Sequence, residues 1–299
     1  MSSQVVVEKY EQIEEKEIEQ EIKREFIKEL SESKYFLFGG TIFFVVITMA
    51  ILAPFISPYD PIAQNMRETL QPPSAKHFLG TDPFGRDVLS RIIWGSRISL
   101  IVGIFSVFFA IVIGVPLGVI AGYFRGKVDM IISRILDVML SFPGIILAIV
   151  IMAVLGQSLN NVILAVSISM IPRFARLARG QTLSIREKEF VLAAVSLGAS
   201  HFSIIKNHIL PNILTPIIVQ STLSLGSAII VEASLSFLGL GVQPPTPTWG
   251  AMLNLGRQYL FTAPWMAYSS GLFITLTVLG FNLLGDGLRD VLDPKMRRT

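Results

Sequence analysis

Long apolar runs without a charged side chain make up much of this chain. Residues 35–59 and residues 98–124 form the first two runs. A helix needs roughly 20 apolar residues to cross about 30 Å of hydrocarbon, so each run is long enough for one transmembrane helix. The first run is too long for a signal peptide and follows an acidic segment rather than a basic one.

A third uncharged run covers residues 138–172, and two more cover residues 207–231 and 258–285. As one helix, the third run would be about 52 Å long at roughly 1.5 Å per residue, which is too long for a single crossing. The polar stretch at 156–161 instead predicts two antiparallel spans that extend into their flanks. The pattern predicts an all-α polytopic membrane protein with six transmembrane helices, and therefore both termini on one side.

Basic side chains predict which side that is, because cytoplasmic loops of membrane proteins are enriched in Lys and Arg. Such residues follow span two (Arg125, Lys127), follow span four (Arg173, Arg176, Arg179, Arg186, Lys188, Lys206) and occupy the C-terminal tail (Arg289, Lys295, Arg297, Arg298). The turn between spans three and four has none. The loop at 60–97 is a partial exception, but long loops follow this rule weakly. We expect cytoplasmic termini, an external loop at 60–97 and a cytoplasmic loop at 173–212.

Composition agrees with a membrane protein, since 16% of the residues are charged compared with about a quarter in globular proteins. Cysteine is absent, which excludes disulfides, zinc–thiolate sites and iron–sulfur clusters. The three histidines have no Cys or carboxylate at metal-ligand spacing. The net charge is +3, but the bases fall in short loops between apolar runs, so we expect no nucleic-acid partner.

Residues 1–34 differ from the rest because they are rich in charge, with apolar residues every four positions at Ile18, Ile22, Phe26 and Leu30. This spacing predicts an amphipathic cytoplasmic helix. A solvated or membrane-surface helix is the simpler interpretation, and a regulatory or docking segment is the alternative. Residues 35–299 then form the transmembrane domain.

Small residues recur every four positions in span two, at Ala110, Gly114, Gly118 and Gly122, with Gly126 one step further. Such a row makes a smooth groove on one helix face and allows another helix to approach closely. Internal packing is the simpler interpretation, and a seam against a partner subunit is the alternative.

Motifs for ATP hydrolysis or nucleophilic catalysis are missing from the sequence. GYFRGKV (122–128) has too few residues between its glycines for a phosphate-binding loop, and Val128 stands where Ser or Thr would reach magnesium. No G-x-S-x-G elbow is present. We therefore expect no enzymatic activity in this chain and no cofactor bound by it.

Acidic side chains near the spans are candidates for function, because an unpaired charge in lipid is costly. Glu232 follows Asn212 by about 20 residues, which predicts a hydrated position near the outer interface. Structural pairing of Glu232 is the simpler interpretation, and contact with substrate along the path is the alternative.

Residues 189–212 predict two short helices in the basic loop after span four. Glu189 favours a helix start, because the helix dipole stabilises an anion there. Gly198 is able to end that helix in the left-handed conformation. Ala199 and Ser200 then begin a second helix, with Ser200 as its N-cap. Pro211 and Asn212 mark the start of span five.

This segment resembles the EAA loop of ABC importer permeases, through Glu189, Ala193, Ala194, Gly198, Ile205, Leu210 and Pro211. Four further stretches resemble the same family, in particular the C-type subunits of dipeptide and oligopeptide permeases: HFLGTDPFGRDVLSRIIWGSRISL (77–100), VEASLSFLGLG (231–241), PTWGAML (247–253) and FNLLGDGLRDVLDP (281–294). The resemblance runs from about residue 35 to the C-terminus and implies a type I importer permease with a MetI-like fold in a prokaryotic cell membrane.

The resemblance also implies partners. They are a homologous second permease subunit, two cytoplasmic ABC ATPases that bind ATP and magnesium, an extracytoplasmic solute-binding protein, a peptide substrate and the surrounding lipid. By the same resemblance Glu189 would meet a basic group of the ATPase, the face with Ala193 and Ala194 would pack closely against it, and Gly198 would set the bend.

Several alternatives stay open from the sequence. Asp82, Arg86 and Asp87 in the external loop either contact the binding protein or the mouth of the path, or form local ion pairs. Nickel import by the same architecture is an alternative to peptide import. A stand-alone secondary carrier would predict inverted repeats and buried ion ligands, which the sequence does not show. A purely structural membrane scaffold would leave the 189–212 hairpin unexplained.

Overall fold

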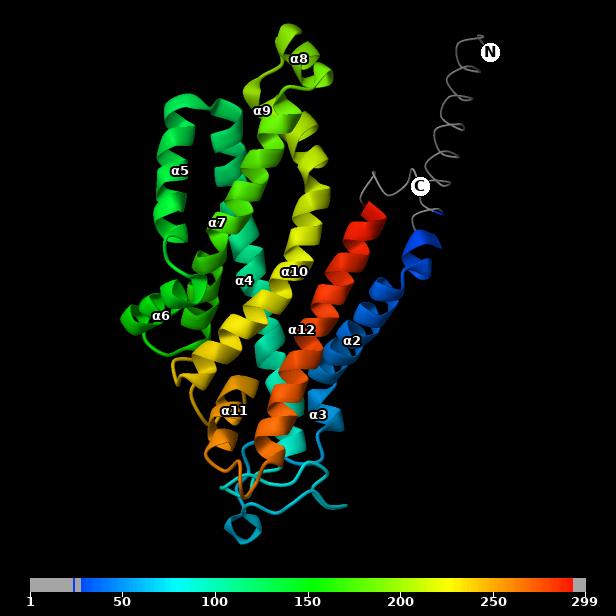
Figure 1. Cartoon of the computed structure of the whole chain (residues 1–299), viewed down its shortest axis with the longest axis vertical. Helices are drawn as coiled ribbons and strands as arrows, with labels where there is room; N and C mark the ends of the chain where they lie inside the picture. The colour runs from blue at the N-terminus through cyan, green and yellow to red at the C-terminus, as the bar shows by residue number, and fades with distance from the viewer. Residues whose placement is uncertain (1–23, 25–27, 293–299) are drawn as a thin grey trace.

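The computed structural model describes residue 24 and residues 28–292, and all regular elements within them are helices (Figure 1). The helices are α2 (Lys34–Ile51), α3 (Ala53–Ile56), η1 (Met66–Glu68), α4 (Val88–Phe124), α5 (Gly126–Leu140), α6 (Gly144–Leu155), α7 (Leu159–Arg186), α8 (Glu189–Ser196), α9 (His201–Ile204), η2 (Ile205–Ile209), α10 (Leu210–Phe237), α11 (Trp249–Arg257) and α12 (Trp265–Leu292). The predicted all-α class is confirmed. The predicted helix through Ile18, Ile22 and Phe26 lies outside the described residues.

Five helical stretches among the described residues are long and apolar enough to cross a membrane. They are α2, α4, α7, the continuous stretch His201–Phe237 and α12. A sixth crossing is made only if α5 and α6 count together, and these two helices are bent by 88° at their junction. The polytopic fold is therefore confirmed, and the predicted third span is bent sharply rather than straight.

The third span departs from the prediction because of the stretch Ser141–Pro143. Pro143 lacks a backbone donor and cannot continue α5, so the chain turns and α6 starts at Gly144. Helix α5 begins at Gly126, so the flank that it adds before the uncharged run at 138–172 is longer than predicted. The predicted turn at 156–161 is confirmed: Gly156 has φ 79°, and Ser158 caps α7.

Helix α5 is held to α7 by ion pairs. The Arg179 guanidinium donates to both oxygens of Asp129, at 2.5 and 2.7 Å. Arg176 donates to Asp137 at 2.6 Å. Asp129 and Asp137 of α5 therefore face Arg179 and Arg176 of α7. Searching the sequence for runs without charge could not reveal these pairs.

The row of small residues on α4 packs inside the chain. A Cβ atom at Gly114 would lie 2.8 Å from the carbonyl oxygen of Ile171, and one at Gly122 would lie 2.8 Å from that of Arg179. At Gly118 a Cβ would overlap the carbonyl oxygen of Ala175. The three glycines let α4 and α7 touch backbone to backbone, so internal packing is confirmed for them.

The remaining spans, α2, α10 and α12, also contact α4. Helix α2 lies along α12, where a Cβ at Gly39 would be 2.7 Å from the carbonyl oxygen of Gly280. Helix α10 contacts α4, α7 and α12. Helix α11, which was not predicted, packs between α10 and α12 (Figure 1).

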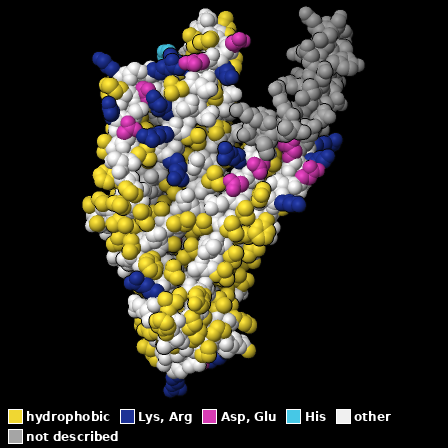
Figure 2. Space-filling view, viewed as in Figure 1, with side chains coloured by type: hydrophobic (Ala, Val, Ile, Leu, Met, Phe, Trp, Pro, Cys, Tyr) yellow, Lys and Arg dark blue, Asp and Glu magenta, His cyan; other side chains and the backbone are white. Residues whose placement is uncertain are grey.

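The two ends of the bundle differ. One end carries α8 and α9, and we call it the hairpin end; the opposite end carries residues 57–87, and we call it the loop end (Figure 1). Lys, Arg, Asp and Glu gather toward the hairpin end, and apolar side chains cover much of the remaining visible face (Figure 2). The predicted loop at 60–97 is too long, because α4 already begins at Val88.

Candidate functional site

A helical hairpin made of α8, α9 and η2 stands at the hairpin end of the bundle (Figure 1). We call it the α8–α9 hairpin. Helix α8 ends as predicted at Gly198, whose φ is 78°. Ala199 donates its N–H to the carbonyl of Ala194, and Gly198 donates to that of Val195. These two bonds form a Schellman motif, which satisfies the last carbonyls of α8 and fixes the turn.

The second arm of the α8–α9 hairpin differs from the prediction. Ser200 caps it as expected, accepting the N–H of Ser203 at 3.3 Å. Pro211 does not separate this arm from span five, because helical structure runs without interruption from His201 to Phe237. Pro211 stands at the start of α10, as predicted, and the π-helical turn η2 precedes it; such a wider turn accommodates a residue that has no N–H to donate. The arm and the span therefore form one continuous element.

Buried apolar side chains anchor the α8–α9 hairpin. Val191, Ile204 and Ile209 are 1%, 1% and 0% exposed. Together they tie both arms into the main core around α4 and α7. A displacement of the hairpin therefore has to move the ends of these helices as well.

Polar contacts connect the end of α4 to the α8–α9 hairpin and to Glu187, which lies just before it. The Tyr123 hydroxyl lies 2.8 Å from Nδ1 of His201, and Arg125 donates to the Glu187 carboxylate at 2.6 Å. The Arg125 guanidinium lowers the pKa of that exposed carboxyl. The sequence did not predict either contact, because the partners lie far apart in the chain and Tyr123 lies in an uncharged run.

The outward side of the α8–α9 hairpin is apolar. Leu197 is 88% exposed and Phe202 is 75% exposed, and other large apolar side chains surround them: Phe190, Leu192 and Val195. Apolar side chains are visible at this tip beyond a zone rich in Lys and Arg (Figure 2). An apolar patch at the tip of a charged surface is typical of a protein contact.

The residues singled out from the sequence line this hairpin. Glu189, Ala193, Gly198 and Pro211 are exposed, whereas four others are half-buried: Ala194, Ala199, Ile205 and Leu210. The first group is available to a partner. The second group fixes the hairpin to the bundle.

Asp82, Arg86 and Asp87 face inward at the loop end, where they are 2%, 6% and 3% exposed. Arg86 donates to Asp82 at 2.6 Å. Asp87 caps α4 by accepting the N–H of Ser90 at 2.7 Å and lies 2.9 Å from Nδ1 of His77. The geometry shows the local ion pairs, and a partner at this end would meet other side chains of the loop.

Glu232 is fully buried, so its predicted hydrated position is wrong. Its carboxylate accepts hydrogen bonds from Ser99 on α4, at 3.1 Å, and from Ser236 on its own helix, at 2.8 Å. The prediction counted residues along α10 and could not show that α4 covers this face. Nearby, Trp249 donates to the carbonyl of Ile92 at 2.9 Å. Stretches 77–100, 231–241 and 247–253 thus meet in one cluster.

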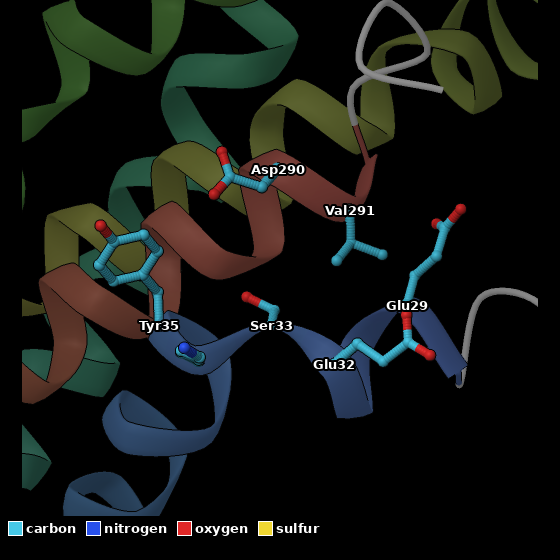
Figure 3. A pocket seen from close by; sticks show the side chains of 7 residues that line it. Glu29, Glu32, Ser33, Tyr35, Asp290 and Val291 are labelled. Atoms are coloured by element: carbon cyan, nitrogen blue, oxygen red, sulfur yellow. The ribbon is translucent and has the colours of Figure 1, made fainter. Parts of the chain in front are cut away.

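A separate hollow lies between the start of α2 and the end of α12 at the hairpin end (Figure 3). Glu29, Glu32 and Asp290 line it together with Tyr35 and Lys34. Its acidic lining favours cations. Among residues 24 and 28–292, no group of His, Asp and Glu side chains is arranged to hold a metal ion.

Comparisons with known proteins agree with this architecture. Residues 114–298 match the family described as binding-protein-dependent transport system inner membrane component, and residues 23–73 match the N-terminal TM domain of oligopeptide transport permease C. The dipeptide transport system permease protein DppC of Alkalihalophilus pseudofirmus is 50% identical over 92% of this chain and 90% of its own length. The glutathione transport system permease protein GsiD of Pectobacterium atrosepticum is 47% identical over 92% and 91%.

A solved structure shares the fold. The MetNI methionine ABC transporter, in inward-facing conformations, superposes with a TM-score of 0.57 at 22% identity, over 68% of this chain and 97% of that one. At this identity the likeness concerns the fold alone. It supports the MetI-like arrangement of helices that the sequence predicts.

Proposed function

The chain belongs to the family of binding-protein-dependent transport inner membrane components, and we propose that its α8–α9 hairpin docks on a cytoplasmic ATPase. The chain is a permease subunit of an ABC importer of the peptide type. Such a subunit works with ATPases and a binding protein. Docking at the hairpin would place the hairpin end in the cytoplasm and the loop end outside, in agreement with the cytoplasmic termini that the sequence predicts.

The exposed apolar tip is the observation that carries this proposal. Leu197 and Phe202 would be unfavourably hydrated in isolation, and burying one such side chain contributes roughly 1.5–3 kcal/mol. Glu189 lies in the first turn of α8, at the opposite end of this helix from Leu197, where it is exposed and presents a charge to a basic group. Ala193 offers a small side chain for close contact on the same exposed side.

The anchoring of the hairpin supports a role in coupling. Its second arm continues into α10 without a break, and Tyr123 connects that arm to α4 through His201. Closure of two ATPases would therefore displace α4 and α10 together. The energy for alternating access would come from hydrolysis of ATP, which the ATPases bind together with magnesium. This chain would hold no cofactor.

We further propose that half of the translocation path for di- or oligopeptides lies in this subunit, opposite a homologous second permease. The names of the two permeases that resemble it over nine-tenths of its length support a peptide-type substrate. Nickel or another small solute remains the second candidate. Ligand binding by the partner solute-binding protein discriminates them, since a peptide-specific protein would bind peptides and not free nickel.

Replacing Glu189 with lysine tests the docking. We expect ATPase retained on the affinity-purified permease complex to fall about tenfold, because one charge-assisted contact contributes roughly 1.5–3 kcal/mol and each 1.4 kcal/mol is tenfold. Membrane insertion should be unchanged, because Glu189 is exposed. Glu32→Lys makes the same charge change at the start of α2 and should retain the ATPase. Equal retention by both variants would refute a docking role for Glu189.

A further inference from the structure

A groove opens on the loop-end side of the bundle, between the segment after α2 and the first turns of α4. It is lined by Pro54, Tyr59 and Ile62, by residues 245–247, and by Trp94, Arg97 and Ile98 of α4. The α8–α9 hairpin contributes no side chain to it, and neither do Glu232 and its hydrogen-bond partners Ser99 and Ser236. A ligand bound in this groove would therefore touch neither the α8–α9 hairpin nor the hydrogen bonds of Glu232.

Two hydrogen-bond donors in this groove have no acceptor. The Arg97 guanidinium lies 5.2 Å from the centre of the Trp94 ring and forms no ion pair with any described residue. The indole Nε1 of Trp94 is buried and without a hydrogen-bond partner in the described part of the chain. Asp60 also lines the groove, with Oδ1 accepting the N–H of Ile62. The buried Nε1 of Trp94 is out of reach of a ligand, but the unpaired and partly exposed Arg97 cation calls for an oxygen-rich anion.

The position of Arg97 along α4 indicates where that anion lies. Residues 98–124 carry no charge, so Arg97 is the last charged side chain before the apolar part of α4. Trp and Arg are typical of the boundary between hydrocarbon and headgroups, where an apolar body meets a polar tip. Trp94 lies one turn closer to the loop end. The groove is therefore at the level of lipid headgroups.

An apolar face continues from the groove along α4. Ile101 lines the groove, and Phe105, Phe108 and Val112 follow at helical spacing on the same side. These three are 47%, 53% and 50% exposed. The surface thus joins a cationic end at headgroup level to an apolar stripe that runs into the membrane.

We propose that this groove binds an anionic phospholipid. Its phosphodiester accepts hydrogen bonds from the Arg97 guanidinium, and one acyl chain lies along Ile101, Phe105 and Phe108. The charge of Arg97 provides the preference for an anionic headgroup, and the apolar stripe provides the preference for a lipid over a free phosphate. The lipid would hold the segment after α2 against the start of α4.

Fluorescence quenching tests this site, because the chain has three tryptophans and Trp94 is the one in the groove. The assembled transporter is reconstituted in phosphatidylcholine vesicles with increasing amounts of phosphatidylglycerol brominated on its acyl chains. The Trp94 signal is the difference between the natural chain and Trp94→Phe. We expect this signal to be quenched at a lower mole fraction of brominated phosphatidylglycerol than of brominated phosphatidylcholine.

Arg97→Gln provides the decisive variant. The mole fraction of brominated phosphatidylglycerol that quenches half of the Trp94 signal should rise about tenfold, as expected for one charge-assisted hydrogen bond. Arg257→Gln, which removes an exposed arginine on α11, should leave it unchanged. Equal quenching by the two brominated lipids, or no effect of Arg97→Gln, would overturn the proposal. A Trp94 signal that no brominated lipid quenches would overturn it too, and would show that protein covers the groove.

Discussion

Replacing Gly118 with leucine is expected to prevent assembly of the transporter. A Cβ at this position would overlap the backbone carbonyl of Ala175, and backbone in the middle of α7 cannot move aside as a side chain can. Overpacking of a well-packed core usually costs about 1–3 kcal/mol, and the added branches of leucine raise that further. We expect nearly all of the chain to be lost from the monodisperse complex after purification from membranes.

The chain offers a matched control for this result on the other helix of the pair. Gly180 lies in α7, has an ordinary helical conformation, and has no atom within 4 Å of a Cβ built on it. Gly180→Leu should therefore assemble as the natural chain does. If Gly118→Leu were purified in the same yield as Gly180→Leu, the close packing of α4 on α7 would be contradicted.

Replacing Gly198 with tryptophan is expected to lower transport at least tenfold while the chain still inserts. The structure has no atom within 4 Å of a Cβ at Gly198, so the effect does not come from a clash inside this chain. It comes from the positive φ of 78°, which costs an ordinary residue about 1–2 kcal/mol, and each 1.4 kcal/mol is tenfold in population. A bulky ring at the exposed turn would also hinder docking. Uptake of labelled peptide into vesicles, relative to ATP hydrolysed, measures the loss.

Asparagine at the same position is a control that relieves both causes. It adopts the left-handed conformation more readily than other residues and adds little bulk, so Gly198→Asn should keep most of the transport. Normal uptake by the Gly198→Trp transporter would show that neither the turn nor the surface around it matters for coupling.

The sequence predicts the helical hairpin well because local chemistry determines it. Gly198 and Ser200 act within a few residues of their own positions, through a left-handed turn and an N-cap, and both roles are confirmed. The sites of close helix approach follow from spacing alone, as with Gly114 and Gly118. Such features need no knowledge of which helices are neighbours.

Other features depend on neighbours and were missed. Glu232 seemed hydrated from its distance along α10, but Ser99 on α4 buries it. The 88° break at Pro143 lies inside an uncharged run, where counting charges could not place it. Pro211 marks the start of α10 as predicted, but the π-helical turn η2 joins α10 to the preceding arm without a break. In each case the missing information was the tertiary contact or the place of a proline within its helix.

Accessibility of the hairpin tip tests the central claim most directly, because the chain has no native cysteine. Leu197→Cys places one thiol at the exposed turn, and Lys127→Cys places one at the exposed start of α5. We expect maleimide to label both thiols in the complex stripped of its ATPases, and the Leu197→Cys thiol alone to become protected when the ATPases are restored. Equal labelling of Leu197→Cys with and without ATPases would contradict docking at the α8–α9 hairpin.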